Sequence, residues 1–333
     1  NDKSKVSLTV HTSIVLAIIC GVFLSVAGFI FANPILKLMG SPDDVIMLAT
    51  LYLKIYFLGM PALLIYNFGA AILRAVGNTK HPLYFLTISG VLNILLNLLL
   101  VICFSMGVAG VAIATVVSEY LSAALIIWYL SEKSEELKLT RSDLKIDPYI
   151  LKRVIAIGIP AGLQGTIFSL SNVVIQSAIN SFGSDVVAGN SATMNIEGFV
   201  YMAMNAIYQT AITFVGQNYG AGKKKRVLRC TLQAEAIVVI VGLFFGVSAY
   251  IFSTELLHIY SGSPAVVEAG KIRCAYILPI YFLCGSMDVM VGALRGIGQS
   301  VVPMVTSLIG ACALRLVWIS TVFKMHRTTG MLY

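Results

Sequence analysis

The sequence contains few charged residues, and this is its most informative feature. Only 11% of the 333 residues are Asp, Glu, Lys or Arg, whereas 58% are hydrophobic, and the mean hydropathy is +0.89. Soluble domains average about 25% charged residues, so the composition excludes an ordinary globular protein. A membrane-spanning helix needs about 20 apolar residues, and the chain has room for many. We therefore expect an all-α polytopic membrane protein.

Clustered reactive side chains are also scarce. The six cysteines form no Cys-x-x-Cys pair and have none of the four histidines clustered around them, which argues against a metal site or a disulfide framework. No nucleophile has a base nearby, and no glycine-rich phosphate loop is present. We predict that the protein is not an enzyme and uses no metal or organic cofactor. The net charge is +8, which in a soluble protein would suggest a nucleic-acid partner. In a membrane protein the positions of the individual charges matter more than their sum, so we expect no nucleic-acid partner.

Nine apolar segments are each long enough to cross a bilayer. Backbone polar groups in hydrocarbon must be paired within the segment, so we expect helices and not strands. Glycine, serine, asparagine, aspartate and proline occupy the connectors, as is typical of turns. The predicted helices are 7–33, 45–73, 82–105, 108–130, 151–181, 187–215, 227–253, 265–294 and 303–323.

The basic residues are distributed unevenly among the connectors. If connectors alternate between the two sides of the membrane, sixteen of the 23 Lys and Arg lie on the side of the N-terminal residues and three on the other. Basic loops stay in the cytoplasm. The long polar stretch 131–150 is then a cytoplasmic linker between an N-terminal lobe, 1–130, and a C-terminal lobe, 151–333.

The sequence also matches itself at an offset of about 221 residues. Residues 73–82 and 294–303 share Leu-Arg-x-x-Gly-(x)4-Pro, and the Gly-Ser-Pro of 40–42 falls on that of 262–264 with a slip of one. Equivalent loops lie on the same side, so the repeat is parallel and contains six helices. We expect two pseudo-symmetric six-helix lobes, of which this chain, as an internal piece of a longer protein, holds nine helices.

Four motifs at the helix ends resemble those of the multidrug and toxic compound extrusion (MATE) transporters. They are Pro61 with residues 70–79, Gly-Ile-Pro-Ala-Gly-Leu-Gln at 158–164, Phe-Val-Gly-Gln-Asn-Tyr-Gly-Ala-Gly at 214–222, and Gly-Ala-Leu-Arg-Gly at 292–296. The likeness runs from the family's third to its eleventh helix and points to the bacterial DNA-damage-inducible efflux branch. It implies a monomeric multi-pass protein of the bacterial cytoplasmic membrane that exports small cationic or amphipathic compounds in exchange for Na⁺ or H⁺.

Acidic residues within the predicted helices are the first candidates for ion coupling, because ionisable groups inside a bilayer are usually functional. Asp288 is the first choice; its alternative role is a structural ion pair with Arg315. Glu197 is the second, in a polar run that includes Asn195. Because Glu197 shares a helix face with Asn190, an interhelical hydrogen-bond network is the alternative there.

Amides form a second set of candidates, for a cavity that holds the substrate. Gln164, Asn172 and Gln176 recur along one predicted helix, and Asn205 and Gln209 follow on the next. Amide oxygens bind substrate or Na⁺ without burying a charge. Ordinary hydrogen bonding between helices, worth about 1 kcal/mol each, is the alternative.

The first lobe adds Tyr66, Asn67 and Glu119 to the cavity candidates. Asn67 falls on Asp288 under the repeat, so the equivalent positions differ in charge. This difference favours an ion site in the second lobe and a substrate surface in the first. The resemblance has one departure: some relatives carry an acid in the helix after Pro160, where this chain has only amides.

An ion-coupled drug exporter that works by alternating access of two lobes is therefore our main hypothesis. The alternative is a lipid-linked oligosaccharide flippase of the same superfamily. A flippase should line its cavity with several basic residues, and here only Lys54 and Arg315 lie deep in predicted helices.

Overall fold

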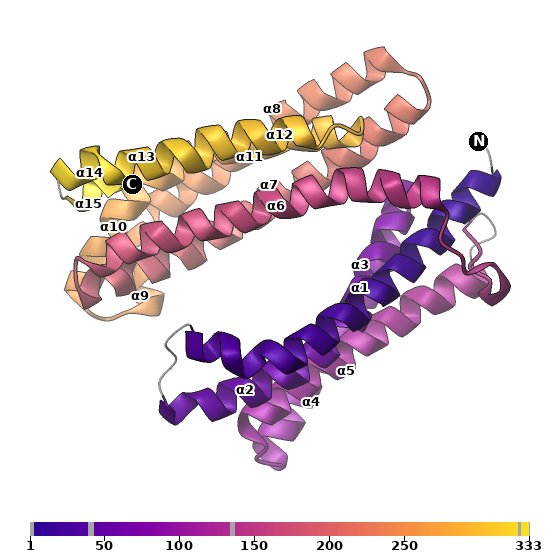
Figure 1. Ribbon diagram of the computed structural model, residues 1–333. Coiled ribbons are helices and arrows are strands. Elements are labelled where there is room, and N and C mark those ends of the chain that lie inside the picture. The colour runs from indigo at the N-terminus through magenta and orange to yellow at the C-terminus, as the bar shows by residue number, and fades with distance from the viewer. Residues whose placement is uncertain (1–2, 39–42, 134–136, 326–327, 333) are drawn as a thin grey trace. The chain divides into compact units, whose positions relative to one another are not determined.

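The computed structural model describes residues 3–38, 43–133, 137–325 and 328–332 (Figure 1). Over these ranges the chain forms helices and no strands, which confirms the all-α polytopic fold class. It divides into two compact units, Asn1–Arg153 and Val154–Tyr333. The connector at 40–42 lies outside the described residues.

The first unit is built from five α-helices and shorter helical turns. Its helix α1 packs on α2 and α3, and α5 packs on α2, α3 and α4. The elements are α1 (Lys3–Leu38), α2 (Asp43–Leu58), α3 (Met60–Ala75), α4 (Lys80–Asn97), the π-helical η1 (Leu98–Cys103), α5 (Gly107–Trp128), the π-helical η2 (Tyr129–Lys133) and the 3-10 turn η3 (Arg141–Asp143).

The second unit contains α7 and all of α6 except its first residues, which lie before Val154. Helix α7 packs on α8, α10 and α11, and α8 also packs on α11. The elements are α6 (Pro148–Asn180), α7 (Ser184–Gly220), α8 (Lys224–Ile251), α9 (Ser253–Tyr260), α10 (Pro264–Ile277), η4 (Leu278–Ile280), α11 (Phe282–Gly296), α12 (Val301–Ser307), η5 (Leu308–Ala313), α13 (Leu314–Ser320), α14 (Val322–Met325) and α15 (Thr329–Leu332).

Membrane-spanning potential is spread over both units. By length and composition, six helical stretches of the described chain can cross a bilayer, and up to eight if each of two bent helix pairs forms one span. These eight correspond to predicted segments. The ninth, 187–215, forms α7, but its polar residues keep it outside that set.

Two predicted helices are bent in the structure, and both bends lie beside a proline. The segment predicted as 45–73 breaks at Gly59 with a 44° bend, and the segment 265–294 breaks at Tyr281 with a 46° bend. Proline lacks the N–H for the preceding turn, which permits such a break. By contrast, α6 continues through Pro160.

The internal repeat reappears in backbone geometry. Gly77 and Gly298 both have φ of 87°, a left-handed conformation that favours glycine. Both turns close in the same way, with 2.9 Å bonds from Asn78 N to Leu73 O and from Gln299 N to Leu294 O. These equivalent turns support the duplication at the expected offset.

Close helix contacts repeat as well. A Cβ at Gly21 would lie 2.5 Å from the Pro61 Cα, and a Cβ at Gly242 would lie 2.8 Å from the Phe282 Cα. Gly21 and Gly242 are equivalent under the repeat, and so are Pro61 and Phe282. In each unit, glycine therefore lets a long helix approach the helix that follows the bend.

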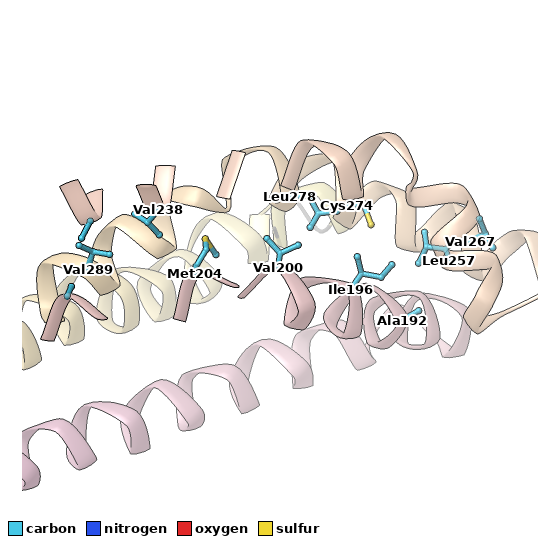
Figure 2. Close-up of a cluster of buried hydrophobic side chains, with 12 residues drawn as sticks. Ala192, Ile196, Val200, Met204, Val238, Leu257, Val267, Cys274, Leu278 and Val289 are labelled. Carbon is cyan, nitrogen blue, oxygen red and sulfur yellow. The ribbon is translucent and has the colours of Figure 1, made fainter. Parts of the chain in front are cut away.

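Each unit has its own apolar core. In the second unit, buried residues of α7, α8, α9, α10 and α11 pack together (Figure 2). Met204 occupies the space left by two glycines, since a Cβ at Gly242 or Gly285 would lie 3.0 or 2.7 Å from its Sδ. In the first unit, Val10, Ile14, Leu73 and Ile126 belong to the corresponding cluster. Many other large apolar side chains face outward, as expected of a surface that contacts lipid.

The linker is attached to α1 by two buried polar residues. His11 donates from Nδ1 to Ser7 O at 2.8 Å and accepts the Thr140 N–H at Nε2 at 3.1 Å. Thr12 accepts the Asp147 N–H at 3.0 Å. Within the linker, the Thr140 hydroxyl donates to Asp143 and holds the pKa of that carboxyl below its usual value.

Candidate functional site

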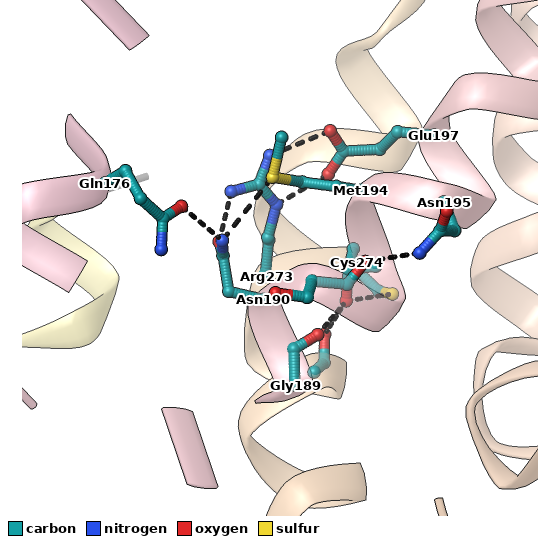
Figure 3. Close-up of polar contacts among 11 residues, drawn as sticks. Gln176, Gly189, Asn190, Met194, Asn195, Glu197, Arg273 and Cys274 are labelled. Carbon is teal, nitrogen blue, oxygen red and sulfur yellow. Dashed lines mark hydrogen bonds and ion pairs between the residues drawn. The ribbon is translucent and has the colours of Figure 1, made fainter. Parts of the chain in front are cut away.

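A buried ion pair lies in the second unit, between α7 and α10 (Figure 3). Arg273 Nε donates to Glu197 Oε1 at 2.7 Å, and Nη2 donates to Oε2 at 2.8 Å. Glu197 is 7% exposed and Arg273 9%. The two hydrogen bonds of such a bidentate pair offset the free-energy cost of removing both charges from water. Either charge buried alone would be strongly destabilising.

Amides extend this pair toward α6. Arg273 Nη1 also donates to Asn190 Oδ1, and Asn190 Nδ2 donates to Gln176 Oε1 at 3.3 Å. Asn190 and Glu197 thus share the helix face that the sequence predicts, and the structure records the interhelical network that is the alternative role of Glu197. Asn195 lies apart: it is exposed, and its Nδ2 donates to Ser191 O of its own helix at 2.9 Å.

The local approach of α7 and α10 positions this pair. A Cβ at Gly189 would lie 2.6 Å from Val266 O and 2.7 Å from Gly270 N, so glycine is needed there. The Thr193 hydroxyl hydrogen-bonds Gly270 O at 3.1 Å across the contact. Small residues at such contacts allow transmembrane helices to pack closely, and one turn further on α7 presents Glu197 to Arg273.

Asp288, on α11, lies in a second polar cluster of the same unit. The Tyr201 hydroxyl of α7 hydrogen-bonds its carboxylate, and Asn205 Nδ2 reaches that hydroxyl at 3.4 Å. Among the described residues, Asp288 forms no salt bridge. Arg315, its alternative partner, donates to Asn172 Oδ1 at 3.1 Å. The carboxylate of Asp288 is therefore held by one neutral hydrogen-bond donor, Tyr201, while Arg295 acts on it electrostatically without a salt bridge.

Gln164 joins a third contact, near the end of α11. Its Oε1 accepts from Arg295 Nη2 at 2.7 Å, while Arg295 Nη1 donates to the Tyr208 hydroxyl of α7. Arg295 thus ties α6, α7 and α11 together. The remaining amide of the predicted set, Gln209, is exposed, and its backbone carbonyl accepts from Thr213.

The first-unit candidates separate into three different environments. Tyr66 is buried and donates to Pro82 O at 2.8 Å, which joins α3 to α4. Asn67 is exposed. Glu119, on α5, reaches the break between α2 and α3, where its Oε2 is buried without a hydrogen-bond partner. Tyr66 therefore has a structural contact, whereas Glu119 has an unsatisfied carboxyl oxygen.

Two arginines complete these clusters, and sequence reasoning did not pair them. Arg273 follows Lys271 by two residues in the sequence, and only the fold shows that its side chain meets Glu197. Arg295 matches Arg74 under the repeat, and the sequence alone gives it no partner. Glu235 also gains a partner that the sequence did not indicate, the Ser286 hydroxyl of α11. No periodicity along one helix identifies such contacts between helices.

The carboxylates of these clusters do not gather in one place. Among the described residues, no group of three or more His, Cys, Asp or Glu is positioned to hold a metal ion. Glu197 is instead paired with Arg273, and Asp288 lies beside the Tyr201 hydroxyl.

Comparison with known proteins identifies the family of this chain. The MatE family model matches residues 1–99 and 160–319. The chain belongs to the MatE family. Solved MATE structures share this fold: an outward-facing multidrug resistance MATE transporter superposes with a TM-score of 0.90 at 19% identity, covering 99% of this chain and 74% of the other.

Curated relatives of this MatE chain come from several bacteria. It is 29% identical to the probable multidrug resistance protein YpnP of Bacillus subtilis, over 87% of this chain and 64% of the relative. Identity is 27% to the probable multidrug resistance protein NorM of Thermotoga maritima, over 80% and 58%. It is 25% to an FAD transporter of Shewanella oneidensis, over 92% and 68%. The chain thus spans 58–68% of the length of these three relatives.

Proposed function

We propose that the protein is a secondary active transporter that exports cationic or amphipathic organic compounds in exchange for Na⁺ or H⁺, by alternating access of two lobes. The observation that carries this proposal is Asp288, a carboxylate within an apolar helical unit that accepts a hydrogen bond from the neutral Tyr201 hydroxyl, lies within electrostatic reach of Arg295 and, among the described residues, forms no salt bridge. A cation that binds there removes the electrostatic cost of the charge and biases two conformations. The multidrug resistance relatives support drugs as the substrate class.

The site is assigned in two parts. Asp288, with Tyr201 and Asn205, forms the ion-coupling cluster. Glu197 remains a coupling candidate, although its pairing with Arg273 favours a positioning role. Asn195 is the weakest member of the set, because it bonds only within its own helix. The amides Gln164, Asn172, Gln176 and Gln209, with Tyr66, Asn67 and Glu119, remain substrate-cavity proposals.

The flippase alternative predicts free basic side chains in the cavity. Arg273 is instead paired with the carboxylate of Glu197, and Arg295 and Arg315 hydrogen-bond the amides Gln164 and Asn172. This engagement favours a cationic cargo over an anionic, lipid-linked one. One relative is an FAD transporter, and FAD is an anion. A transport assay should therefore also be able to detect an anionic substrate.

The wider assignment follows from the same proposal. We place the protein in the bacterial cytoplasmic membrane, as a monomer that contacts lipid and a small organic substrate, with the linker 131–150 in the cytoplasm. Its domains are an N-terminal lobe, 1–130, and a C-terminal lobe, 151–333. Within the family we favour the DNA-damage-inducible efflux branch. The protein is a transporter and not an enzyme, and the coupling ion is its only inorganic partner.

The test is an efflux assay with the full-length protein in efflux-deficient cells. We expect the parent to expel ethidium and to raise fluoroquinolone resistance, and Asp288→Asn to abolish the ion dependence of efflux. Glu197→Gln is measured beside it, together with the amount of folded protein in the membrane. Unchanged ion-dependent efflux in both variants overturns the site assignment, and a parent that expels no cation overturns the substrate class.

A further inference from the structure

Helix α6 runs parallel to the helical stretch made of α12, η5 and α13 in the second unit (Figure 1). Near the start of both, the Ser300 hydroxyl donates to Ile157 O at 2.9 Å. Near the end of both, the ring centroids of Phe182 and Phe323 lie 5.9 Å apart. Because both residue numbers increase from the first contact to the second, the two stretches run in the same direction.

Arg315 bridges the same two stretches between these contacts. Its Nη1 donates to Asn172 Oδ1 at 3.1 Å. Over the described chain this is the one hydrogen bond of its guanidinium, and Arg315 forms no salt bridge there. At 1.5 Å per residue, Arg315 lies about 22 Å from Ser300 and about 12 Å from Phe323 along the helix. A neutral amide thus holds a cation well inside the candidate span Val301–Met325.

The charge of this guanidinium is not balanced by the acidic side chains of the neighbouring helices. Those of α7, α8 and α11 have other partners: Glu197 pairs with Arg273, Asp288 bonds the Tyr201 hydroxyl, and Glu235 bonds the Ser286 hydroxyl. A charged side chain within a span is costly unless it faces the protein interior or a water-filled cavity. We therefore expect Arg315 to face water rather than lipid.

The surroundings of Arg315 are polar and open. Ser169 and Asn172 are exposed on α6, and their spacing puts them on one face of that helix. A Cβ at Gly165, one turn before Ser169, would have nothing within 4 Å, and neither would one at Gly310, about one turn before Arg315. Gly310 belongs to the π-helical η5, and π-helical turns are frequent at functional sites. Open space therefore lies beside an unbalanced guanidinium.

We propose that Arg315, together with the amide of Asn172, binds the carboxylate of a zwitterionic organic substrate. The guanidinium offers paired N–H donors that match the two oxygens of a carboxylate, and Asn172 Nδ2 is a further donor. One guanidinium balances one carboxylate, whereas a flippase needs several basic residues. The inference rests on the proposed drug export and extends its cationic cargo to compounds that also carry one carboxylate.

Binding of a fluoroquinolone to the full-length protein in lipid nanodiscs tests this directly. The drug carries one carboxylate and one amine, and its methyl ester keeps the amine but lacks the carboxylate. Both are titrated against the parent, Arg315→Gln and Lys324→Gln, a control at an exposed basic residue of the same span. We expect Arg315→Gln to weaken binding of the acid about 10–100-fold, the usual effect of losing a charge-assisted contact. Binding of the ester should be unchanged, and Lys324→Gln should bind both compounds as the parent does.

The pattern of losses distinguishes a carboxylate site from a structural role of Arg315. Arg315→Lys keeps the charge without the paired donors, so it should recover part of the lost affinity. Equal losses for acid and ester in Arg315→Gln, at an unchanged melting temperature, overturn the proposal. It is also overturned if Arg315→Gln binds the acid as tightly as the parent, or if the parent binds the acid no more tightly than the ester.

Efflux measured in cells separates this proposal from the transport function. If the parent expels ethidium but Arg315→Gln binds the acid normally, only the carboxylate site is wrong. If the parent expels neither ethidium nor the fluoroquinolone, drug export is overturned, while the binding difference between acid and ester still decides the role of Arg315.

Discussion

At the scale of single residues, Glu197 and Arg273 dominate the interior of the second unit. Both side chains are buried, and two hydrogen bonds from the Arg273 guanidinium to the Glu197 carboxylate balance the two charges. Buried pairs often add little net stability over apolar residues, but one partner left alone is strongly destabilising. The pair therefore constrains how α7 packs on α10 more than it stabilises either helix.

We predict that Arg273→Leu lowers the free energy of unfolding by about 3–5 kcal/mol, because it leaves Glu197 buried without a partner. The double variant Glu197→Leu, Arg273→Leu should recover much of that loss. Thermal or denaturant unfolding of the four proteins gives the coupling energy directly. Additive effects of the two single changes would show that the pair is not an energetic unit.

The residue scale is also where sequence reasoning reached least far. It selected Asp288, Glu197 and Glu119 because charge in an apolar segment is rare, and it placed Asn190 and Glu197 on one face by helical spacing. It could not pair Glu197 with Arg273 or Gln164 with Arg295, because those contacts depend on the rotation of separate helices. Asn195 met the compositional criterion, yet it faces outward.

At the scale of elements, glycine decides how closely helices approach. A Cβ at Gly21 would meet the backbone of Pro61 at 2.5 Å, whereas a Cβ at Gly90 of α4 would have nothing within 4 Å. Because the obstacle at Gly21 is backbone, a Cβ there could be accommodated only by a shift of the whole helix that carries Pro61.

We therefore expect Gly21→Ala to destabilise the protein by about 1–3 kcal/mol, the usual effect of overpacking. Gly90→Ala is the matched control and should be neutral or slightly stabilising, because alanine favours helix by about 1 kcal/mol over glycine. Melting temperatures of the purified variants compare the two. Equal effects at both positions would show that the α1–α3 approach does not depend on glycine.

The linker is a second element whose position depends on few contacts. His11→Phe removes both ring hydrogen bonds to Ser7 and Thr140. We expect faster proteolysis within residues 137–147, measured by limited digestion of the reconstituted protein, with core helices still protected. His258→Phe, in α9 of the other unit, is the control. Equal digestion of parent and His11→Phe would contradict a role of His11 in holding the linker.

Element positions were well predicted from the sequence, and element shapes less so. Hydrophobic length located the helices, and shared turn chemistry located the repeat at Gly77 and Gly298. The breaks at Gly59 and Tyr281 could not be predicted from proline alone. Pro61 and Pro279 each permit a kink, but α6 continues through Pro160, so a proline need not produce one. Whether a helix bends depends on what packs into the bend, as Glu119 does beside Gly59.

At the scale of the whole molecule, each unit combines an outward-facing apolar surface with buried or partly buried carboxyl groups. Glu119 lies in the first unit, and Glu197 and Asp288 lie in the second. Cation binding at such groups changes the electrostatic cost of a conformation by several kcal/mol, enough to shift a two-state equilibrium substantially. Such a shift is the physical basis of the proposed ion-driven export.

Transport by the full-length protein in proteoliposomes tests this central claim most directly. A cationic dye is loaded, and a gradient of Na⁺ or H⁺ is imposed on the opposite side. We predict that one of these gradients drives dye against its own concentration gradient in the parent, and that Asp288→Asn abolishes this movement while dye binding persists. Dye movement that is identical with and without both ion gradients, or unchanged in Asp288→Asn, would contradict ion-coupled export through this site.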